Sequence, residues 1–208
     1  GDFPDNEHDM LSIAHKNALR LTLLINDLLD MEKLLAGKMV FDMRAQLLLP
    51  ILEQSLESNA AYADTFSVRL VLQADIGDLQ VLLDAQRLQQ ILANFISNAV
   101  KFSPPRGQVE IQVSRMGDHV RIAVVDHGPG VSDEFRARIF QKFSQADSSD
   151  SRQRGGTGLG LAISKAFVER MQGTIGFDSE LGKGATFFAI FPIFIAEEKN
   201  INQAGNTV

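Results

Sequence analysis

Gly155-Gly156-Thr157-Gly158-Leu159-Gly160-Leu161 is the stretch around which the rest of the sequence is organised. Its glycines let the backbone adopt positive φ and let another group approach the N–H groups closely. The stretch runs into residues 161–168, whose apolar side chains have helical spacing. A glycine-rich turn that opens a helix favours phosphate, because it offers unpaired N–H groups and the positive end of the helix dipole. The alternative is an ordinary turn, since neither a Walker loop nor a dinucleotide GxGxxG is present.

The composition describes a globular protein with a substantial core. The chain has 208 residues, 45% of them hydrophobic and 22% charged, a net charge of −6 and no cysteine. This charge argues against nucleic-acid binding, and the lack of cysteine excludes disulfides and thiolate metal sites. No signal peptide is visible, and the longest apolar run, 187–196, contains Pro192 and predicts an edge strand rather than a membrane span. We therefore expect a cytoplasmic chain, whose parent protein could be anchored in the inner membrane.

Residues 7–36 have the pattern of one long helix. Leu24 and Met31 widen its apolar seam toward a bundle face, and Gly37 supplies a C-terminal stop. The seam steps by alternating three and four residues, like a heptad with one polar member: Leu11, Ala14, Ala18, Leu21, Ile25, Leu28, Glu32 and Leu35. The pattern predicts a helix of a dimeric bundle, and packing on its own domain is the alternative.

Strands and helices interleave after this helix. The predicted strands are 39–43, 67–73, 78–83, 108–114, 119–126, 174–179 and 185–192. The predicted helices are 49–62, a long helix from the Asp84 cap to about Phe102, a short helix from the Ser132 cap to about Phe140, and the helix after the glycine stretch. Residues 144–154 are predicted to be mobile. The fold class is α+β, a two-layer α/β sandwich with a mixed sheet and helices on one face, preceded by one long bundle helix.

Three polar side chains share one stripe of the long capped helix. Asn94, Asn98 and Lys101 are spaced i, i+4 and i+7, which places them within roughly 60° of one another. Amide oxygens can ligate Mg²⁺ or orient its waters, and the lysine can neutralise phosphate oxygens. An ordinary polar helix face is the alternative interpretation.

A carboxylate follows a strand of alternating hydrophobic residues. Asp126 at that strand end can accept the exocyclic amine of adenine, while Gly128 and Gly130 let a base lie against the backbone. A simple turn is the alternative, because Asp and Gly-Pro-Gly form turns anyway. The aromatic residues of 140–143 are either core packing or an anchor for the mobile segment. Thr186 follows a glycine turn, and its hydroxyl could reach the same base.

Together and in this order, these stretches resemble the ATP-binding domain of the sensor histidine kinases of two-component systems. Residues 94–102 are similar to the N box, 126–130 to the G1 box, 140–143 to the F box and 155–161 to the G2 box. The resemblance covers about residues 10–195 and implies the histidine-kinase/gyrase-type ATPase fold.

Two further stretches extend the resemblance beyond the ATP-binding domain. Residues 26–30 with 36–38 resemble the end of the second helix of the dimerisation domain. Lys142-Phe143-Ser144-Gln145-Ala146-Asp147 resembles the hybrid subclass, in which a receiver domain follows.

The resemblance implies a role for each motif. Asp126 would bind adenine, Asn98 with Asn94 would hold Mg²⁺, and Lys101 would contact phosphate. Residues 144–154 would form a lid over ATP, with Arg152 or Arg154 as a transition-state cation. The nucleotide-binding set would be Asp126, Gly128, Gly130, Phe143, Arg154, Gly156, Thr157, Gly158, Leu159, Gly160 and Thr186.

The resemblance also implies a domain division and an activity. Residues 1–6 would be a disordered leader, 7–37 the second helix of an incomplete dimerisation domain, 38–196 the catalytic domain, and 197–208 a linker or disordered tail. The domain would transfer the γ-phosphoryl group of ATP to a histidine on the dimerisation helix, for relay to the aspartate of a response-regulator receiver domain. The acceptor helix would belong to the same protein or to its partner in a homodimer.

One departure from the family concerns the phosphoacceptor. The family carries it in a His-Glu/Asp-x-Arg-Thr-Pro box, and neither His8 nor His15 has that context. We therefore expect the first bundle helix and its histidine to lie outside this chain. A nucleotide-binding pseudokinase that only regulates a partner is the alternative. Hydrolysis is disfavoured, because the related gyrase-type ATPases use a glutamate as general base where this chain has Asn94.

Overall fold

The computed structural model describes residues 5–145 and 157–195. The helices are α1 Asp5–Leu35, α2 Leu48–Thr65, α3 Ala85–Phe102, α4 Asp133–Arg136 and α6 Gly160–Arg170. The strands are β1 Arg44–Leu47, β2 Arg69–Gln73, β3 Gln80–Leu83, β4 Gln108–Met116, β5 His119–Val125, β6 Thr174–Glu180 and β7 Gly184–Pro192.

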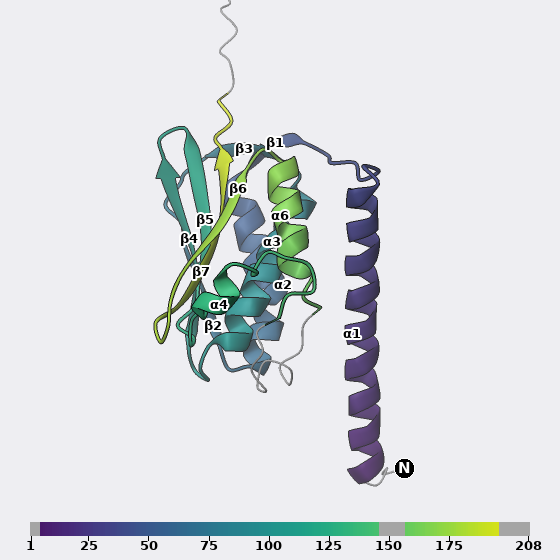
Figure 1. The fold of residues 1–208 in the computed structure, drawn as a ribbon. Helices are drawn as coiled ribbons and strands as arrows, with labels where there is room; N and C mark the ends of the chain where they lie inside the picture. Colours follow the sequence, from purple (N-terminus) through teal and green to yellow (C-terminus); the bar gives the residue numbers. More distant parts are fainter. Residues whose placement is uncertain (1–4, 146–156, 196–208) are drawn as a thin grey trace, which may run out of the picture.

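A five-stranded mixed sheet forms one layer of the molecule. Its strand order is β2-β4-β5-β7-β6, with β2 parallel to β4 and every other pair antiparallel. Helices α2, α3 and α6 cover one face of it (Figure 1). Strands β1 and β3 make a separate antiparallel pair at one end. The predicted α/β sandwich is confirmed.

The central helix α3 shows why the two layers hold together. Its apolar side chains recur on one face and lie buried against the sheet: Leu88, Ile91, Leu92, Phe95, Ile96, Ala99 and Val100. Full burial of a side chain of this size stabilises a fold by about 1.5–3 kcal/mol. The helix starts where Asp84 accepts hydrogen bonds from the backbone N–H groups of Gln86 (3.0 Å) and Arg87 (3.1 Å), as its predicted capping role requires.

Residues 39–43 do not form the predicted strand; β1 begins only at Arg44. The reason lies in a side chain, because the Asp42 N–H donates to Asp84 Oδ2 at 3.0 Å instead of to a neighbouring strand. Met39, Phe41 and Met43 still pack against the core. The alternation of apolar and polar residues thus predicted correctly which side chains face the core. It did not predict that the backbone of this segment pairs with no described strand.

Three smaller expectations are also corrected. Helix α1 begins at Asp5, so the end of the expected leader is helical. The predicted helix at 132–140 is shorter, since α4 ends at Arg136 and Ser132 makes no capping hydrogen bond through its side chain. Strand β7 is not at an edge, because it lies between β5 and β6. Pro192 is tolerated there because it is the last residue of the strand.

Helix α1 stands beside α6, and a single face of α1 meets the domain (Figure 1). Met31 and Leu34 are buried on that face. The predicted heptad seam lies on a different face, about 100° round the helix from the buried side chains, and Leu21, Ile25 and Leu28 along it are exposed. The apolar seam therefore remains uncovered while a different side of the helix packs on the domain. In the described part of the chain, no helix is both long enough and apolar enough to cross a membrane.

Candidate functional site

Asp126 lies at the end of β5 with its side chain buried. Its Oδ1 accepts hydrogen bonds from the backbone N–H groups of Gly128 (2.8 Å) and Ala185 (3.2 Å). Burial raises the pKa of this carboxyl above its ordinary value, although the two N–H groups act in the opposite direction. Among the described residues, none donates to Oδ2, so this oxygen remains available to a ligand that brings its own N–H donor.

The glycines around Asp126 are required by close packing. A Cβ on Gly128 would lie 2.6 Å from the carbonyl oxygen of Phe102, at the end of α3. Gly130 and Gly184 have positive φ, and a Cβ on either would meet backbone carbonyl oxygen, that of Glu180 and that of Asp126 respectively. The predicted glycine positions thus join the end of α3 to the β6–β7 turn and shape the wall beside Asp126.

The structure does not bring Thr186 to Asp126. Thr186 is paired with Val125 in the β5–β7 register, whereas its neighbour Phe187 is buried on the helix-covered face. Side chains alternate between the two faces of a sheet, so Thr186 lies on the other face from Phe187. The backbone of Ala185 meets the Asp126 carboxylate instead.

Asn94 joins α3 to the start of α6. Its Nδ2 donates to the carbonyl oxygen of Gly160 (2.9 Å) and to Ser164 Oγ (3.2 Å). A Cβ on Gly160 would meet the Asn94 side chain, which explains the last glycine of the G2-like stretch. Asn94 therefore fixes where α6 begins, in addition to any contact with a ligand.

Asn98 and Lys101 continue the predicted stripe toward the end of α3. Both are partly buried, and Lys101 lies in the last turn of α3. The Asn98 side chain makes no hydrogen bond with another described residue, which leaves its amide oxygen available to a cation. Within the described ranges, no group of three or more His, Cys, Asp or Glu side chains could hold a metal by itself. A Mg²⁺ ion here would need amide oxygen, water and phosphate as ligands, and that donor set suits Mg²⁺.

The described part of the glycine stretch begins at Thr157. Thr157 Oγ1 accepts a hydrogen bond from the N–H of Leu159 (3.1 Å) and donates to Asp27 Oδ2 on α1 (2.7 Å). Gly158 has a φ of +70°, and a Cβ there would lie 3.0 Å from the backbone of Phe143. Leu159 is buried, so the loop is fixed at this point, immediately before α6 begins at Gly160.

The two aromatic residues of the F-like stretch differ. Phe140 packs edge-on against Phe177 at 5.9 Å, and Phe177 stacks on Phe187 of the core at 5.7 Å. Phe143 is 67% exposed and has a φ of +59°. Phe140 thus packs against the core, as one of the two interpretations of this stretch expected, while a nucleotide contact from Phe143 stays a prediction. Arg154 and Gly156 lie outside the described residues.

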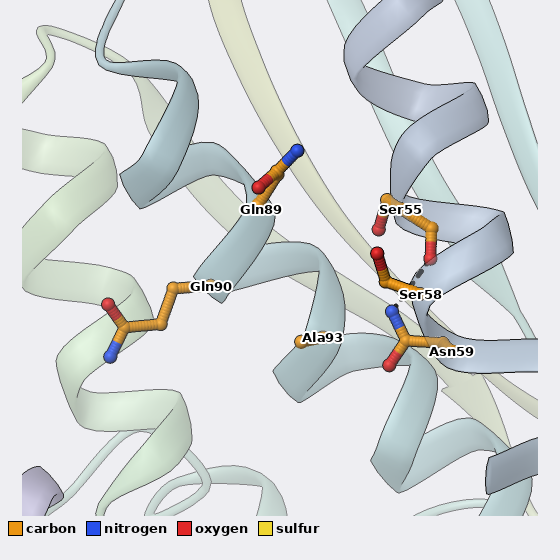
Figure 2. A pocket seen from close by; sticks show the side chains of 6 residues that line it. All are labelled: Ser55, Ser58, Asn59, Gln89, Gln90 and Ala93. Carbon is orange, nitrogen blue, oxygen red and sulfur yellow. Dashed lines mark hydrogen bonds between the residues drawn. The ribbon is translucent and has the colours of Figure 1, made fainter. Parts of the chain in front are cut away.

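The structure also shows a polar cavity apart from these residues. It measures about 320 Å³ and lies between α2 and α3 (Figure 2). Its lining is Ser55, Ser58, Asn59, Gln89, Gln90 and Ala93. None of these side chains is cationic, so the cavity does not suit a triphosphate.

Sequence reasoning missed three contributors to the site. Ala185 contributes only a backbone N–H, which leaves no trace in the residue type. Ser164 is a buried polar residue on α6, and its place four residues after Gly160 was a usable signal. Asp27 carried no signal, because it is 130 residues away from its partner Thr157 along the chain.

Comparisons with known proteins agree with this geometry. Residues 83–194, more than half of the chain, match the family described as histidine kinase-, DNA gyrase B-, and HSP90-like ATPase. Over 194 residues the chain is 37% identical to the circadian input-output histidine kinase CikA of Synechococcus elongatus, covering 92% of this chain and 26% of CikA. It is 40% identical over 187 residues to the sensor histidine kinase GacS of Pseudomonas protegens, covering 86% and 20%. The chain thus spans only about a fifth to a quarter of the length of these relatives.

Solved structures give the same result. Full-length ShkA in complex with AMPPNP matches with a TM-score of 0.77 and 31% identity, over 93% of this chain and 40% of ShkA. The Acinetobacter baumannii histidine kinase AdeS has a TM-score of 0.72 at 22% identity, over 93% of this chain and 88% of AdeS, which shows the fold alone. The chain belongs to the histidine kinase-, DNA gyrase B-, and HSP90-like ATPase family, and it carries the ATP-binding catalytic domain of a sensor histidine kinase.

Proposed function

We propose that this domain binds Mg²⁺-ATP between a base end and a phosphate end. The base end is Asp126 with Gly128, Gly130 and Ala185. The phosphate end is Asn94, Asn98 and Lys101 of α3 with residues 157–160. The observation that carries the proposal is the Asn94–Gly160 hydrogen bond, which joins the N-like stripe to the glycine loop although they are 66 residues apart. ShkA, the relative solved with AMPPNP, supports a nucleotide at the corresponding domain.

Each end has chemistry suited to its part of the nucleotide. Asp126 Oδ2 would accept the exocyclic amine of adenine, while Oδ1 stays engaged by two backbone N–H groups. Lys101 would neutralise phosphate oxygens, and the N–H groups at the start of α6 would receive them. Asn98, with Asn94, would hold Mg²⁺, which when bound neutralises charge on the phosphates.

The activity proposed is transfer of the γ-phosphoryl group of ATP to a histidine of a phosphoacceptor helix, followed by relay to a receiver-domain aspartate. Phosphoryl transfer depends mainly on positioning and charge neutralisation, so the domain needs no general base. Asn94 agrees with this role, because an amide bonded to Gly160 and Ser164 does not activate water.

The partners proposed follow from α1. The exposed Leu21, Ile25 and Leu28 form an apolar row that would be covered by bundle helices, including the acceptor helix, in a homodimer. Residues 7–37 would then be part of the dimerisation domain and 38–196 the catalytic domain. A response-regulator receiver domain would dock nearby, as in the solved complex of the kinase ThkA with TrrA. We also propose the hybrid subclass and a cytoplasmic location, where ATP is supplied.

Label transfer from γ-labelled ATP tests the proposal. The chain is incubated with Mg²⁺ and labelled ATP, alone and together with a longer form of the protein that includes a His-box helix. We expect tight ATP binding by the chain and acid-labile, base-stable label on the longer form only.

Two other outcomes would overturn parts of the proposal. Tight ATP binding without label on either form would indicate a regulatory pseudokinase. Rapid release of phosphate without label would indicate a hydrolase. The Asp126→Asn protein serves as control, because it should lose both binding and label while remaining folded.

A further inference from the structure

Helix α1 reaches the glycine loop through one carboxylate. Asp27 Oδ2 accepts a hydrogen bond from Thr157 Oγ1 at 2.7 Å, and the same Thr157 oxygen accepts the Leu159 N–H at 3.1 Å. The Thr157 hydroxyl therefore bridges the carboxylate on α1 and the backbone N–H of Leu159, the residue before α6. This contact joins the 26–30 stretch, which resembles the dimerisation helix, to the G2-like stretch, and so it joins two predicted domains.

We propose that Asp27 is a positioning residue of the nucleotide site, which holds the glycine loop through Thr157 and makes the docking of α1 oppose the binding of nucleotide phosphates. The inference rests on the proposed function, because it requires that the loop receives phosphate.

The negative charge of Asp27 is the reason why docking of α1 would oppose the binding of phosphates. The start of α6 attracts anions, and a carboxylate near it takes part of the attraction that a phosphate would otherwise receive. A second negative charge a few ångströms from the first is repelled, most strongly where little water screens the pair. Asp27 is half-buried, and its burial raises the pKa of the carboxyl, with the nearby Asp30 adding to the effect and Thr157 opposing it. Water therefore screens Asp27 less than it would an exposed carboxylate.

The packing of α1 is slight enough for this repulsion to matter. Met31 and Leu34 are the only α1 side chains that are buried among those that the structure describes. Beside them lies an open cavity of about 690 Å³, bordered by α1, residues 140–142 and α6. A contact held by so few groups can open at a modest energetic cost. A nucleotide that prefers the undocked arrangement would shift the population of α1 toward it.

Asp30 provides a matched control on the same helix. It lies one turn after Asp27, and its Oδ2 accepts a hydrogen bond from Gln90 Nε2 at 2.9 Å. Gln90 belongs to α3, so Asp30 does not bond to the glycine loop. Asp30→Asn removes the same unit of charge from the same helix face without touching Thr157.

The test measures the affinities of ATP, ADP and adenosine, with Mg²⁺ present, for the unchanged chain, Asp27→Asn and Asp30→Asn. Asparagine still accepts the Thr157 hydroxyl, so Asp27→Asn removes charge alone. We expect it to tighten ATP binding by roughly threefold to tenfold, ADP less, and adenosine not at all. Asp30→Asn should have a smaller effect on ATP.

An effect that grows with the number of phosphates on the ligand distinguishes this inference from a purely structural role of Asp27. An equal change for all three ligands, a weaker affinity for ATP, or no change at all would overturn it. If the unchanged chain bound no ATP, the proposed function itself would fail, and that result is visible before any variant is compared.

A second measurement reads α1 directly. Addition of ATP should speed hydrogen exchange at backbone amides of residues 27–34 in the unchanged chain, and less so in Asp27→Asn. In a double-mutant cycle, the effect of Asp27→Asn on ATP affinity should shrink when Thr157→Val has already broken the link. An unchanged effect in the Thr157→Val background would show that Asp27 does not act through this loop.

Discussion

The base end and the phosphate end of the site are built differently. Asp126 is buried and held by backbone N–H groups of its own sheet and turn. The phosphate end is joined by side chains from separate helices, with Asn94 linking α3 to α6 and Asp27 linking α1 to Thr157. The base end is therefore part of the core, while the phosphate end depends on how the helices are arranged. A change of helix position would therefore alter the proposed phosphate contacts without disturbing the proposed recognition of the base.

The largest expected effect tests how far the base end belongs to the core. In Gly184→Ala, a Cβ would meet the carbonyl oxygen of Asp126, and the residue would also keep a φ of +97°. We expect a loss of about 3 kcal/mol in the free energy of unfolding, measured by urea denaturation, because strain and a backbone clash act together.

Gly182→Ala is the matched control in the same turn. Its φ is +79°, but no atom lies within 4 Å of the added Cβ. Only the conformational cost of about 1 kcal/mol should appear. Equal losses in the two variants would mean that close packing at Gly184 is unimportant.

The next effect concerns Asp126→Asn. Because Oδ1 accepts two backbone N–H groups, the amide oxygen should take that position and leave the NH₂ group facing the ligand. The NH₂ group of the asparagine and the exocyclic amine of adenine, both hydrogen-bond donors, would then face each other. We expect a loss of about 2 kcal/mol in binding free energy, roughly 30-fold in ADP affinity by calorimetry. An unchanged affinity would sink the adenine assignment.

The stability of the same variant should depend on pH in a defined direction. The pKa of Asp126 is raised in the folded chain, so the ionised carboxylate lowers stability above that pKa. The penalty is full above the folded pKa and disappears as the pH falls below the unfolded value of about 3.9. Asp126→Asn should therefore be at least as stable as the unchanged chain at pH 7, and this advantage should narrow on acidification.

The smallest effects distinguish the two asparagines of the phosphate end. Asn94→Ala removes two hydrogen bonds and leaves Ser164 without this donor, so the free energy of unfolding should fall by about 1–2 kcal/mol. Asn98→Ala should change it by less than about 0.5 kcal/mol while reducing the Mg²⁺ dependence of ATP affinity. If both variants lost stability equally, Asn98 would have a structural partner rather than a ligand role.

Local sequence patterns predicted those elements whose packing face and capping groups come from neighbouring residues in the chain. The apolar face of α3 and the Asp84 cap follow from residues within one helix and its first turn. Prediction failed where a distant group changed the outcome, because the Asp42 N–H donates to the Asp84 carboxylate and residues 39–43 form no strand. The face of the sheet on which Thr186 lies likewise depends on its register with Val125. The one-dimensional pattern fixes the period of a segment but not the partner of each polar group.

The sequence by itself determined the family, the order of the motifs, the uncovered seam of α1 and the identity of Asp126 and the two asparagines as candidates. Only the tertiary structure decided which oxygen of Asp126 is available, that Asn94 fixes the start of α6, and that Asp27 bonds to Thr157. The physical reason is the separation along the chain between the interacting residues. Periodicity and capping act between residues a few positions apart, whereas these hydrogen bonds join residues that become neighbours only when helices and sheet pack together.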